Sequence, residues 1–330
     1  MANRFNSFRR IALLAQSIAG NNPLLERIEK AMLSRTSPTG PPPLFIIGAP
    51  RTGSTLLFQL LLARYRFVCL TNIQSFFYAS PVVVGRLLYR WIRRTGINTG
   101  FSSKYGYIKG MFSPSEAGRV FARWFGEIGN SSREPGLEKE MVRGSVYFLS
   151  TLFGCPFLAK NLNNSLRLRR IRAIFPEGVF VWVKRDPLFV CQSILEMRRT
   201  VTGSDHHWVS VTPLGYEKLS NRSPLEQVAW QVATIEKNIE HDLSKGQMEK
   251  VIPVDYESLC EEPQKVLRDI CFFYERVAGI PLEETGTRIH SLKPSNRQRL
   301  SGQEWKLLKS YVEQYSGKKS RISSVNDKQQ

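Results

Sequence analysis

The sequence LFIIGAPRTGSTLL, residues 44–57, indicates the fold most clearly. Its first four residues form an apolar run typical of a buried strand, and the residues from Ser54 onward match the start of a helix. Glycines at positions 48 and 53 bound the loop between these two elements. Glycine lets the backbone curl so that successive N–H groups point inward, and the helix adds the positive end of its dipole. The stretch therefore predicts a loop that binds phosphate or sulfate.

The chemistry of this loop differs from that of a nucleotide kinase. The glycine spacing matches the kinase pattern G-x-x-x-x-G-K-[ST], but Ser54 occupies the position of the lysine. Arg51 supplies a cation from inside the loop, while Thr52, Ser54 and Thr55 add hydroxyl donors. The alternative is a plain strand-to-helix turn capped by serine or threonine, but capping alone requires neither Arg51 nor both glycines.

Further apolar runs alternate with amphipathic helical patterns along the chain. We predict buried strands at residues 179–183 and 251–254, with weaker candidates at residues 67–70 and 157–159. This alternation indicates an α/β fold, with a P-loop-like parallel sheet sandwiched between helices in a single domain that carries helical insertions.

The ends of the chain differ in composition from this central part. We expect residues 1–43 to form an N-terminal helical extension and proline-rich linker, residues 44–315 the main domain, and residues 316–330 a disordered tail. Residues 11–19 follow two arginines as in a signal peptide, but they include polar residues and are too short to span a bilayer. We therefore expect amphipathic helices there and a cytoplasmic protein.

The composition limits the partners. The 330 residues include 47 Lys+Arg and 28 Asp+Glu, for a formal net charge of +19, so the surface should attract anions. The basic residues are scattered, which argues against a specific nucleic-acid partner but allows peripheral contact with acidic or membrane surfaces. The five cysteines are widely spaced and contain no C-x-x-C pair, so we expect reduced thiols and no metal.

A second anion site is predicted where the strand at residues 179–183 ends. Arg185, Asp186 and Pro187 follow it, with Asp186 suited to cap a helix and Pro187 to its first position. Ser193 lies about two turns farther on, so it faces the same side as the helix start and can share a ligand with Arg185. A surface arginine beside a capping aspartate is the alternative.

At these two places the sequence resembles the sulfotransferases that use 3′-phosphoadenosine 5′-phosphosulfate (PAPS), and the similarity extends from Leu44 to Ala278. The resemblance implies that PAPS is the co-substrate. It implies that the 3′-phosphate is held by Arg185 and Ser193, and that the phosphosulfate is held by Arg51, Thr52, Gly53, Ser54 and Thr55. The arginine in the loop is closer to the bacterial-type and tyrosylprotein branches than to the cytosolic branch, which has lysine there.

Two further segments resemble the family more loosely. Residues 157–162 resemble the strand whose lysine contacts the transferred group, which implies that role for Lys160, but Leu162 stands where the cytosolic enzymes have a catalytic histidine. Residues 254–263 resemble the segment whose tyrosine packs against adenine, which implies that role for Tyr256. Tyr256 could equally fill the core.

The general base stays open among three residues. Glu116 is the first candidate, although its place in Ser-Pro-Ser-Glu also suits a capping box at a helix start. His206 and His207, in a polar loop beside Trp208, are the other candidates because histidine titrates in the useful range. Tyrosylprotein-type enzymes use a glutamate soon after the first helix, where residues 70–74 of this chain offer only neutral side chains.

The acceptor is expected to be a hydroxyl of a carbohydrate, lipid or small alcohol. Aromatic rings suit such groups, and they gather near residues 101–125 and at Trp208; the alternative for them is helix core. The rings in the first group are Tyr105, Tyr107, Phe112, Phe121 and Trp124. Two rival functions are a P-loop-type small-molecule kinase and a non-catalytic polyanion-binding protein. The sequence specifies no oligomeric state.

Overall fold

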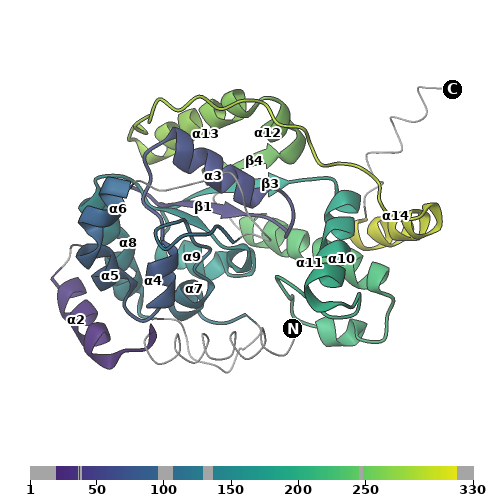
Figure 1. Cartoon of the computed structure of the whole chain (residues 1–330), viewed down its shortest axis with the longest axis horizontal. Coiled ribbons are helices and arrows are strands. Elements are labelled where there is room, and N and C mark those ends of the chain that lie inside the picture. Colours follow the sequence, from purple (N-terminus) through teal and green to yellow (C-terminus); the bar gives the residue numbers. More distant parts are fainter. Residues whose placement is uncertain are drawn as a thin grey trace.

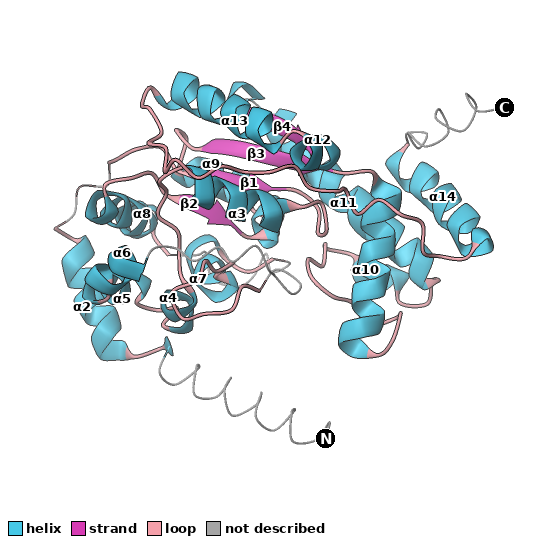
Figure 2. Ribbon diagram, turned by 45° about the horizontal axis from the view of Figure 1, so that its top comes forward, coloured by secondary structure: helices cyan, strands magenta, loops and turns pink. Residues whose placement is uncertain are grey.

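The computed structural model of the chain describes residues 20–35, 37, 39–95, 107–128, 137–244 and 248–317. Its centre is a parallel sheet of four strands in the order β2-β1-β3-β4. The strands are β1 (Leu44–Ile47), β2 (Leu158–Lys160), β3 (Val179–Lys184) and β4 (Val251–Asp255). The α/β prediction is therefore confirmed (Figure 2).

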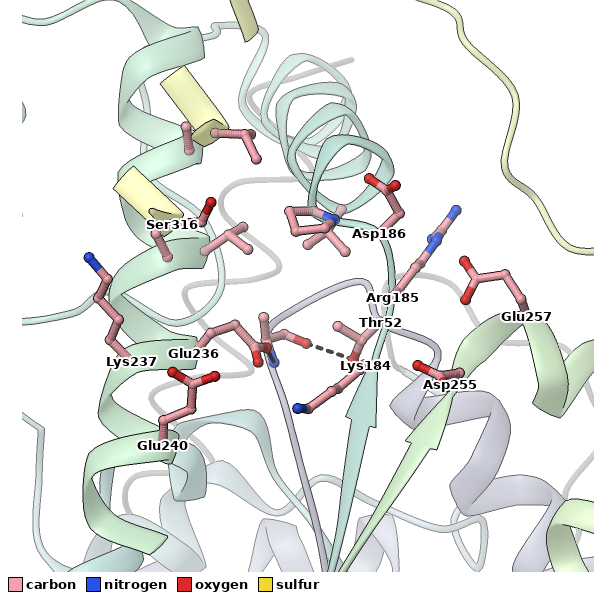
Figure 3. A pocket seen from close by; sticks show the side chains of 17 residues that line it. Thr52, Lys184, Arg185, Asp186, Glu236, Lys237, Glu240, Asp255, Glu257 and Ser316 are labelled. Carbon is pink, nitrogen blue, oxygen red and sulfur yellow. Dashed lines mark hydrogen bonds between the residues drawn. The ribbon is translucent and has the colours of Figure 1, made fainter. Parts of the chain in front are cut away.

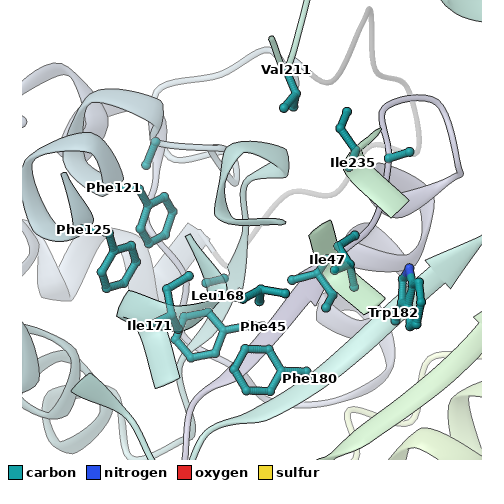
Figure 4. Close-up of a cluster of buried hydrophobic side chains, with 14 of the residues drawn as sticks. Phe45, Ile47, Phe121, Phe125, Leu168, Ile171, Phe180, Trp182, Val211 and Ile235 are labelled. Carbon is teal, nitrogen blue, oxygen red and sulfur yellow. The ribbon is translucent and has the colours of Figure 1, made fainter. Parts of the chain in front are cut away.

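The alternation of side chains along the strands creates a core on each face of the sheet. On one face, Phe45 of β1 stacks on Phe180 of β3, with ring centroids 5.5 Å apart, and Ile47 joins the same cluster (Figure 4). On the other face, Leu44 and Ile46 belong to a separate cluster. Because both faces are buried, the strands appear in the sequence as continuous apolar runs.

Helices cover both faces (Figures 1 and 2). The cluster around Leu44 is completed by α3 (Ser54–Arg64), α12 (Tyr256–Glu261) and α13 (Pro263–Ala278). The cluster around Phe45 is completed by α7 (Gly118–Phe125), α8 (Lys139–Phe153), α9 (Leu168–Ile174), α10 (Pro187–Thr202), α11 (Pro224–Ser244) and α14 (Gly302–Ser316). The first residues of α3 and α10 thus lie at the carboxyl ends of β1 and β3, where ligands of open α/β sheets bind.

The remaining helices flank this body. They are α2 (Pro23–Leu33), α4 (Asn72–Phe76), α5 (Pro81–Leu87) and α6 (Tyr89–Thr95), and 3₁₀ turns occur at Leu162–Leu166, Tyr216–Leu219 and Met248–Lys250. Leu33 of α2 belongs to the core, and the carboxylate of Glu29 accepts hydrogen bonds from the N–H groups of Val82 and Val83, at 2.9 and 3.0 Å. The helix of residues 23–33 is therefore packed onto the main body.

Several expectations need correction. The weak strand prediction at residues 67–70 is reduced to a single bridge between Val68 and Phe157. Phe121 and Trp124 are each 1% exposed and belong to the core, so they do not form an acceptor surface. Tyr105, residues 11–19 and residues 318–330 lie outside the described residues. In the described ranges, no helix has both the length and the apolar content to cross a membrane.

Candidate active site

The loop between β1 and α3 has a backbone that only certain residues can adopt. Gly53 has φ +91°, and a Cβ there would lie 2.4 Å from the ring of Tyr256. Gly48 has φ +148°, and a Cβ there would lie 2.6 Å from the carbonyl oxygen of Val183. Arg51 adopts φ 67°, a costly conformation for a residue with a side chain. Both glycines are therefore required by close packing, which a plain capped turn would not need.

Neighbouring elements hold the start of this loop in place. The hydroxyl of Ser165 accepts a hydrogen bond from the N–H of Gly48 at 3.0 Å and donates one to the carbonyl of Gly48 at 2.9 Å. The hydroxyl of Thr52 donates to the carbonyl of Ala49 at 2.9 Å, and the side chain is 1% exposed. The Thr52 hydroxyl was expected to face an anion, but it stabilises the loop from within.

A cavity of about 220 Å³ brings most of the predicted site residues together. Its lining includes Pro50, Arg51, Gly53, Ser54, Thr55, Leu56, Glu116, Lys160, Leu162, Arg185, Met197, Ser210, Tyr256 and Ser295. Three of these side chains are cationic and one is anionic, so the cavity favours a ligand with several negative charges. Leu56, Leu162 and Met197 add an apolar part to the wall.

The two predicted anion sites meet in this structure. The guanidinium of Arg51 donates from Nε to the hydroxyl of Ser193, at 2.9 Å. Arg185 donates to the carbonyl of Arg51 at 2.9 Å and, from Nε, to the side-chain oxygen of Asn296 at 2.9 Å. Asp186 caps α10 as predicted, because its carboxylate accepts the N–H of Leu188 at 2.8 Å. The start of α10 thus places Arg185 and Ser193 next to the loop between β1 and α3.

Lys160 and Glu116 form an ion pair at one side of the cavity. Lys160 ends β2 and is only 1% exposed, and its ammonium donates to Glu116 and, at 2.9 Å, to the hydroxyl of Thr55. The side chain of Asn161 donates to the backbone carbonyl of Glu116 at 2.8 Å and so fixes that segment. Glu116 does not form the suggested capping box, because α7 begins after Ala117 without a side-chain cap.

The segment that carries Glu116 lies against residues 70–74, the stretch of neutral side chains after the first helix of the main domain. A bridge pairs Thr71 with Pro114, and the N–H of Ser115 donates to the carbonyl of Leu70 at 2.8 Å. Gln74, which belongs to this neutral stretch, is buried and forms a capping box with Thr71. A carboxylate from a later segment thus reaches the cavity beside residues 70–74.

Tyr256 packs against Gly53 and forms part of the cavity wall. Its ring lies under the guanidinium of Arg185, with the guanidinium carbon 4.4 Å from the ring centroid, and its hydroxyl is 3.0 Å from that of Ser295. Tyr256 is 8% exposed and lines the cavity. Its ring is therefore a largely buried surface at the cavity edge, and burial lowers the pKa of the adjacent Arg185 without removing its charge.

The two candidate histidines are not among the residues that line the cavity. His206 and His207 are exposed, and the lining residue closest to them in sequence is Ser210. Trp208 packs inward, with the guanidinium carbon of Arg198 4.6 Å from its ring centroid and the ring of Trp230 6.1 Å away. The geometry thus favours Glu116 over the histidines, and Trp208 is half-buried and is not among the residues that line the cavity.

A second cavity lies on the other side of the loop, between the strand ends and α10, α11 and α14 (Figure 3). Its lining includes Glu236 of α11, whose carboxylate accepts the N–H of Ala49 at 3.2 Å and the indole N–H of Trp182 at 3.1 Å. Burial raises the pKa of Glu236 to about 7. Glu236 therefore ties the start of the loop to β3 and α11.

Sequence reasoning missed Ser165, Glu236, Ser295 and Asn296. Each acts through a partner more than 35 residues away, and none stands in a local motif. Glu236 lies on a helix beside Val232, Ile235 and Ile239, which are buried. Its position next to this apolar stripe was the one signal available in the sequence. A carboxylate next to the apolar stripe of a helix is a candidate for an internal contact.

Comparisons with known proteins identify the family of the chain and relate its fold to solved structures. A family model described as "Sulfotransferase family" matches residues 42–278. The structure is similar to that of sulfotransferase STF9 from Mycobacterium avium, with 16% identity, a TM-score of 0.52 and coverage of 94% of this chain and 78% of that one. It is also similar to sulfotransferase STF1 from Mycobacterium tuberculosis H37Rv, with 14% identity, a TM-score of 0.53 and coverage of 96% and 83%. No curated protein sequence matches the chain.

Proposed function

The chain belongs to the sulfotransferase family, and on that premise we propose that it transfers a sulfuryl group from PAPS to a hydroxyl of an acceptor. The observation that carries the proposal is the single cavity that contains Arg51, Lys160 and Arg185. PAPS has negative charge at two separate places, the 5′-phosphosulfate and the 3′-phosphate. Three cations from three elements in the wall of one cavity suit such a donor better than a ligand with one phosphate group.

Each end of PAPS has its own set of residues in this proposal. The side chains of Arg51, Ser54 and Thr55 and the backbone from Thr52 to Gly53 hold the phosphosulfate, at the start of α3. The 3′-phosphate is held by Arg185 and Ser193, and the ring of Tyr256 contacts the adenine. The loop arginine supports placing the chain in the bacterial-type or tyrosylprotein-like branch.

PAPS supplies the sulfuryl group, which moves from the phosphate oxygen to the acceptor oxygen as the old S–O bond breaks and a new one forms. Lys160 and Arg51 stabilise the negative charge that develops on the sulfuryl and leaving phosphate oxygens. Glu116 takes the proton of the acceptor hydroxyl. The neighbouring ammonium of Lys160 keeps Glu116 oriented, and Asn161 fixes its backbone.

The acceptor enters the same cavity, whose wall includes Leu56, Leu162 and Met197 as well as Glu116. These apolar side chains suit an alcohol attached to an apolar or sugar framework. We propose residues 44–315 as the catalytic domain, because both predicted anion-binding sites and the helices that hold them lie in this range.

The proposal is tested by measuring the formation of 3′,5′-adenosine bisphosphate from PAPS in the presence of a panel of phenols, sugars and lipid alcohols. We expect at least one acceptor to raise the rate, without added metal, and expect the Lys160→Met variant to lose that increase. If no acceptor raises the rate and the protein instead consumes ATP with magnesium, it is a kinase. Salt-sensitive binding that does not distinguish nucleotides would indicate a polyanion-binding protein.

A further inference from the structure

The outer face of α5 and α6 combines exposed apolar side chains with arginines. Leu87 is 69% exposed and Trp91 is 62% exposed, and the two lie four residues apart, so they form a local apolar pair and not two isolated exposed residues. The exposed positions among residues 86–94 form what we call the arginine–tryptophan face: Arg86, Leu87, Arg90, Trp91, Arg93 and Arg94. The two helices lie at one end of the molecule, next to α2 and α8 (Figure 1).

Other residues of the same two helices are packed onto the protein core. Val82, Val83 and Val84 of α5 and Ile92 of α6 are at most 5% exposed. Tyr89 contacts Phe153 of α8 edge to face, with ring centroids 5.1 Å apart. The exposure of Leu87 and Trp91 therefore belongs to a segment that is already packed on its other side.

The charge of this face has one sign. Residues 81–95 contain four arginines and neither aspartate nor glutamate. In the described part of the chain, none of the four guanidinium groups forms an ion pair with a carboxylate. Arg93 donates to the hydroxyl of Tyr89 at 2.6 Å, which orients it without neutralising it. The face therefore presents net positive charge around two apolar side chains.

We propose that the arginine–tryptophan face docks the protein on an anionic lipid bilayer. Arginines bind lipid phosphates while their stems cover apolar surface, and tryptophan and leucine enter the interface between headgroups and acyl chains. Four arginines give an electrostatic attraction that adds to the apolar contact of Leu87 and Trp91. An acidic protein or nucleic acid would engage the charges but would leave these two apolar side chains without a role.

The proposal is tested by co-sedimentation of the full chain with vesicles of phosphatidylcholine alone and of an equimolar mixture of phosphatidylcholine and phosphatidylglycerol. We expect binding to the anionic vesicles and little to the neutral ones. The double variants Leu87→Ser/Trp91→Ala and Arg90→Gln/Arg94→Gln should each bind the anionic vesicles about tenfold or more weakly. Circular dichroism verifies that both variants are folded.

Matched controls on α13 separate this face from the general positive charge of the protein. Arg268→Gln/Arg276→Gln removes the same number of charges, and Phe272→Ala removes an exposed ring that is 65% accessible. Both controls should bind like the wild type. The proposal is overturned if the control and the test variants lose binding equally, or if the wild type fails to bind. It is also overturned if only the arginine variant loses binding, because Leu87 and Trp91 would then not enter the bilayer interface.

Discussion

The Nε of Arg51 donates a hydrogen bond of 2.9 Å to the hydroxyl of Ser193, across 142 residues of sequence. Arg51 belongs to the loop after β1, and Ser193 belongs to the helix after β3. These two strands are neighbours in the sheet, so their carboxyl ends bring the loop and the helix together. One hydrogen bond thus connects the residues proposed to bind the two ends of PAPS.

Removal of the Ser193 hydroxyl should weaken the binding of 3′,5′-adenosine bisphosphate. A hydrogen bond to a charged phosphate contributes about 1.5–3 kcal/mol, so Ser193→Ala should raise the dissociation constant about tenfold to a hundredfold. AMP lacks the 3′-phosphate, so its affinity should change much less. Titration calorimetry with both nucleotides measures this difference, and equal losses for the two would show that Ser193 does not contact the 3′-phosphate.

Lys160→Met should lower the rate of transfer more than it lowers nucleotide affinity. The ammonium lies beside Thr55 and Glu116, and methionine keeps the buried stem while removing the charge. Because Lys160 is proposed to meet charge that develops during transfer, the turnover rate should fall by about 10²-fold or more. The exposed Lys109→Met variant should behave like the wild type. An unchanged rate with any accepted alcohol would exclude Lys160 from the mechanism.

Glu116→Gln tests the proposed base. Glutamine keeps the shape of the side chain but cannot take a proton, so 3′,5′-adenosine bisphosphate should bind normally while transfer falls by about 10²-fold or more. His206→Asn and His207→Asn should retain near-normal turnover, because both side chains are exposed and neither lines the cavity. A large loss in either histidine variant, together with normal turnover in Glu116→Gln, would assign the proton transfer to the loop around Trp208.

Stability should depend on pH through Glu29. This carboxyl caps the start of α5 and is only 4% exposed, and burial raises its pKa from 4.5 to about 8 although the hydrogen bonds from the N–H groups of Val82 and Val83 lower it. Between about pH 5 and pH 8 the folded protein keeps a proton that the unfolded chain has lost. The free energy of unfolding should therefore fall as the pH rises through this window, by at most about 1.4 kcal/mol per pH unit.

Glu29→Gln should flatten this pH dependence, because glutamine can still accept the N–H groups of Val82 and Val83 but does not titrate. Urea unfolding across the window measures the effect, and Glu217→Gln at an exposed position serves as the control. Parallel profiles for wild type and Glu29→Gln would contradict the raised pKa.

The parts of the fold that are recognisable in the sequence depend on local signals. The apolar runs at β1 and β3 are buried on both faces, and the run at the edge strand β4 is buried at Val251 and Val254. The glycines at positions 48 and 53 are required by contacts with Val183 and Tyr256. Each signal sits in a few consecutive residues, so the parallel sheet and the loop followed from sequence alone.

The parts that could not be predicted depend on tertiary contacts. Phe121 and Trp124 look the same in sequence whether they face a substrate or the core, and the structure places them in the core. The proximity of Glu116 to Lys160 arises because residues 113–115 lie against residues 70–73, which no local pattern encodes. Two further contacts are equally long-range: Glu236 accepts the N–H of Ala49 in the loop, and Asn296 accepts the Nε–H of Arg185.

The central claim is that the cavity binds a nucleotide through a 3′-phosphate as well as a 5′-phosphate group. The most direct measurement is titration calorimetry of the wild type and Arg185→Ala with 3′,5′-adenosine bisphosphate, AMP and ATP, without added metal. We expect the wild type to bind 3′,5′-adenosine bisphosphate about tenfold to a hundredfold more tightly than AMP, and expect Arg185→Ala to lose most of that preference. Equal affinities for the three nucleotides, or a preference for ATP that appears when magnesium is added, would contradict the claim.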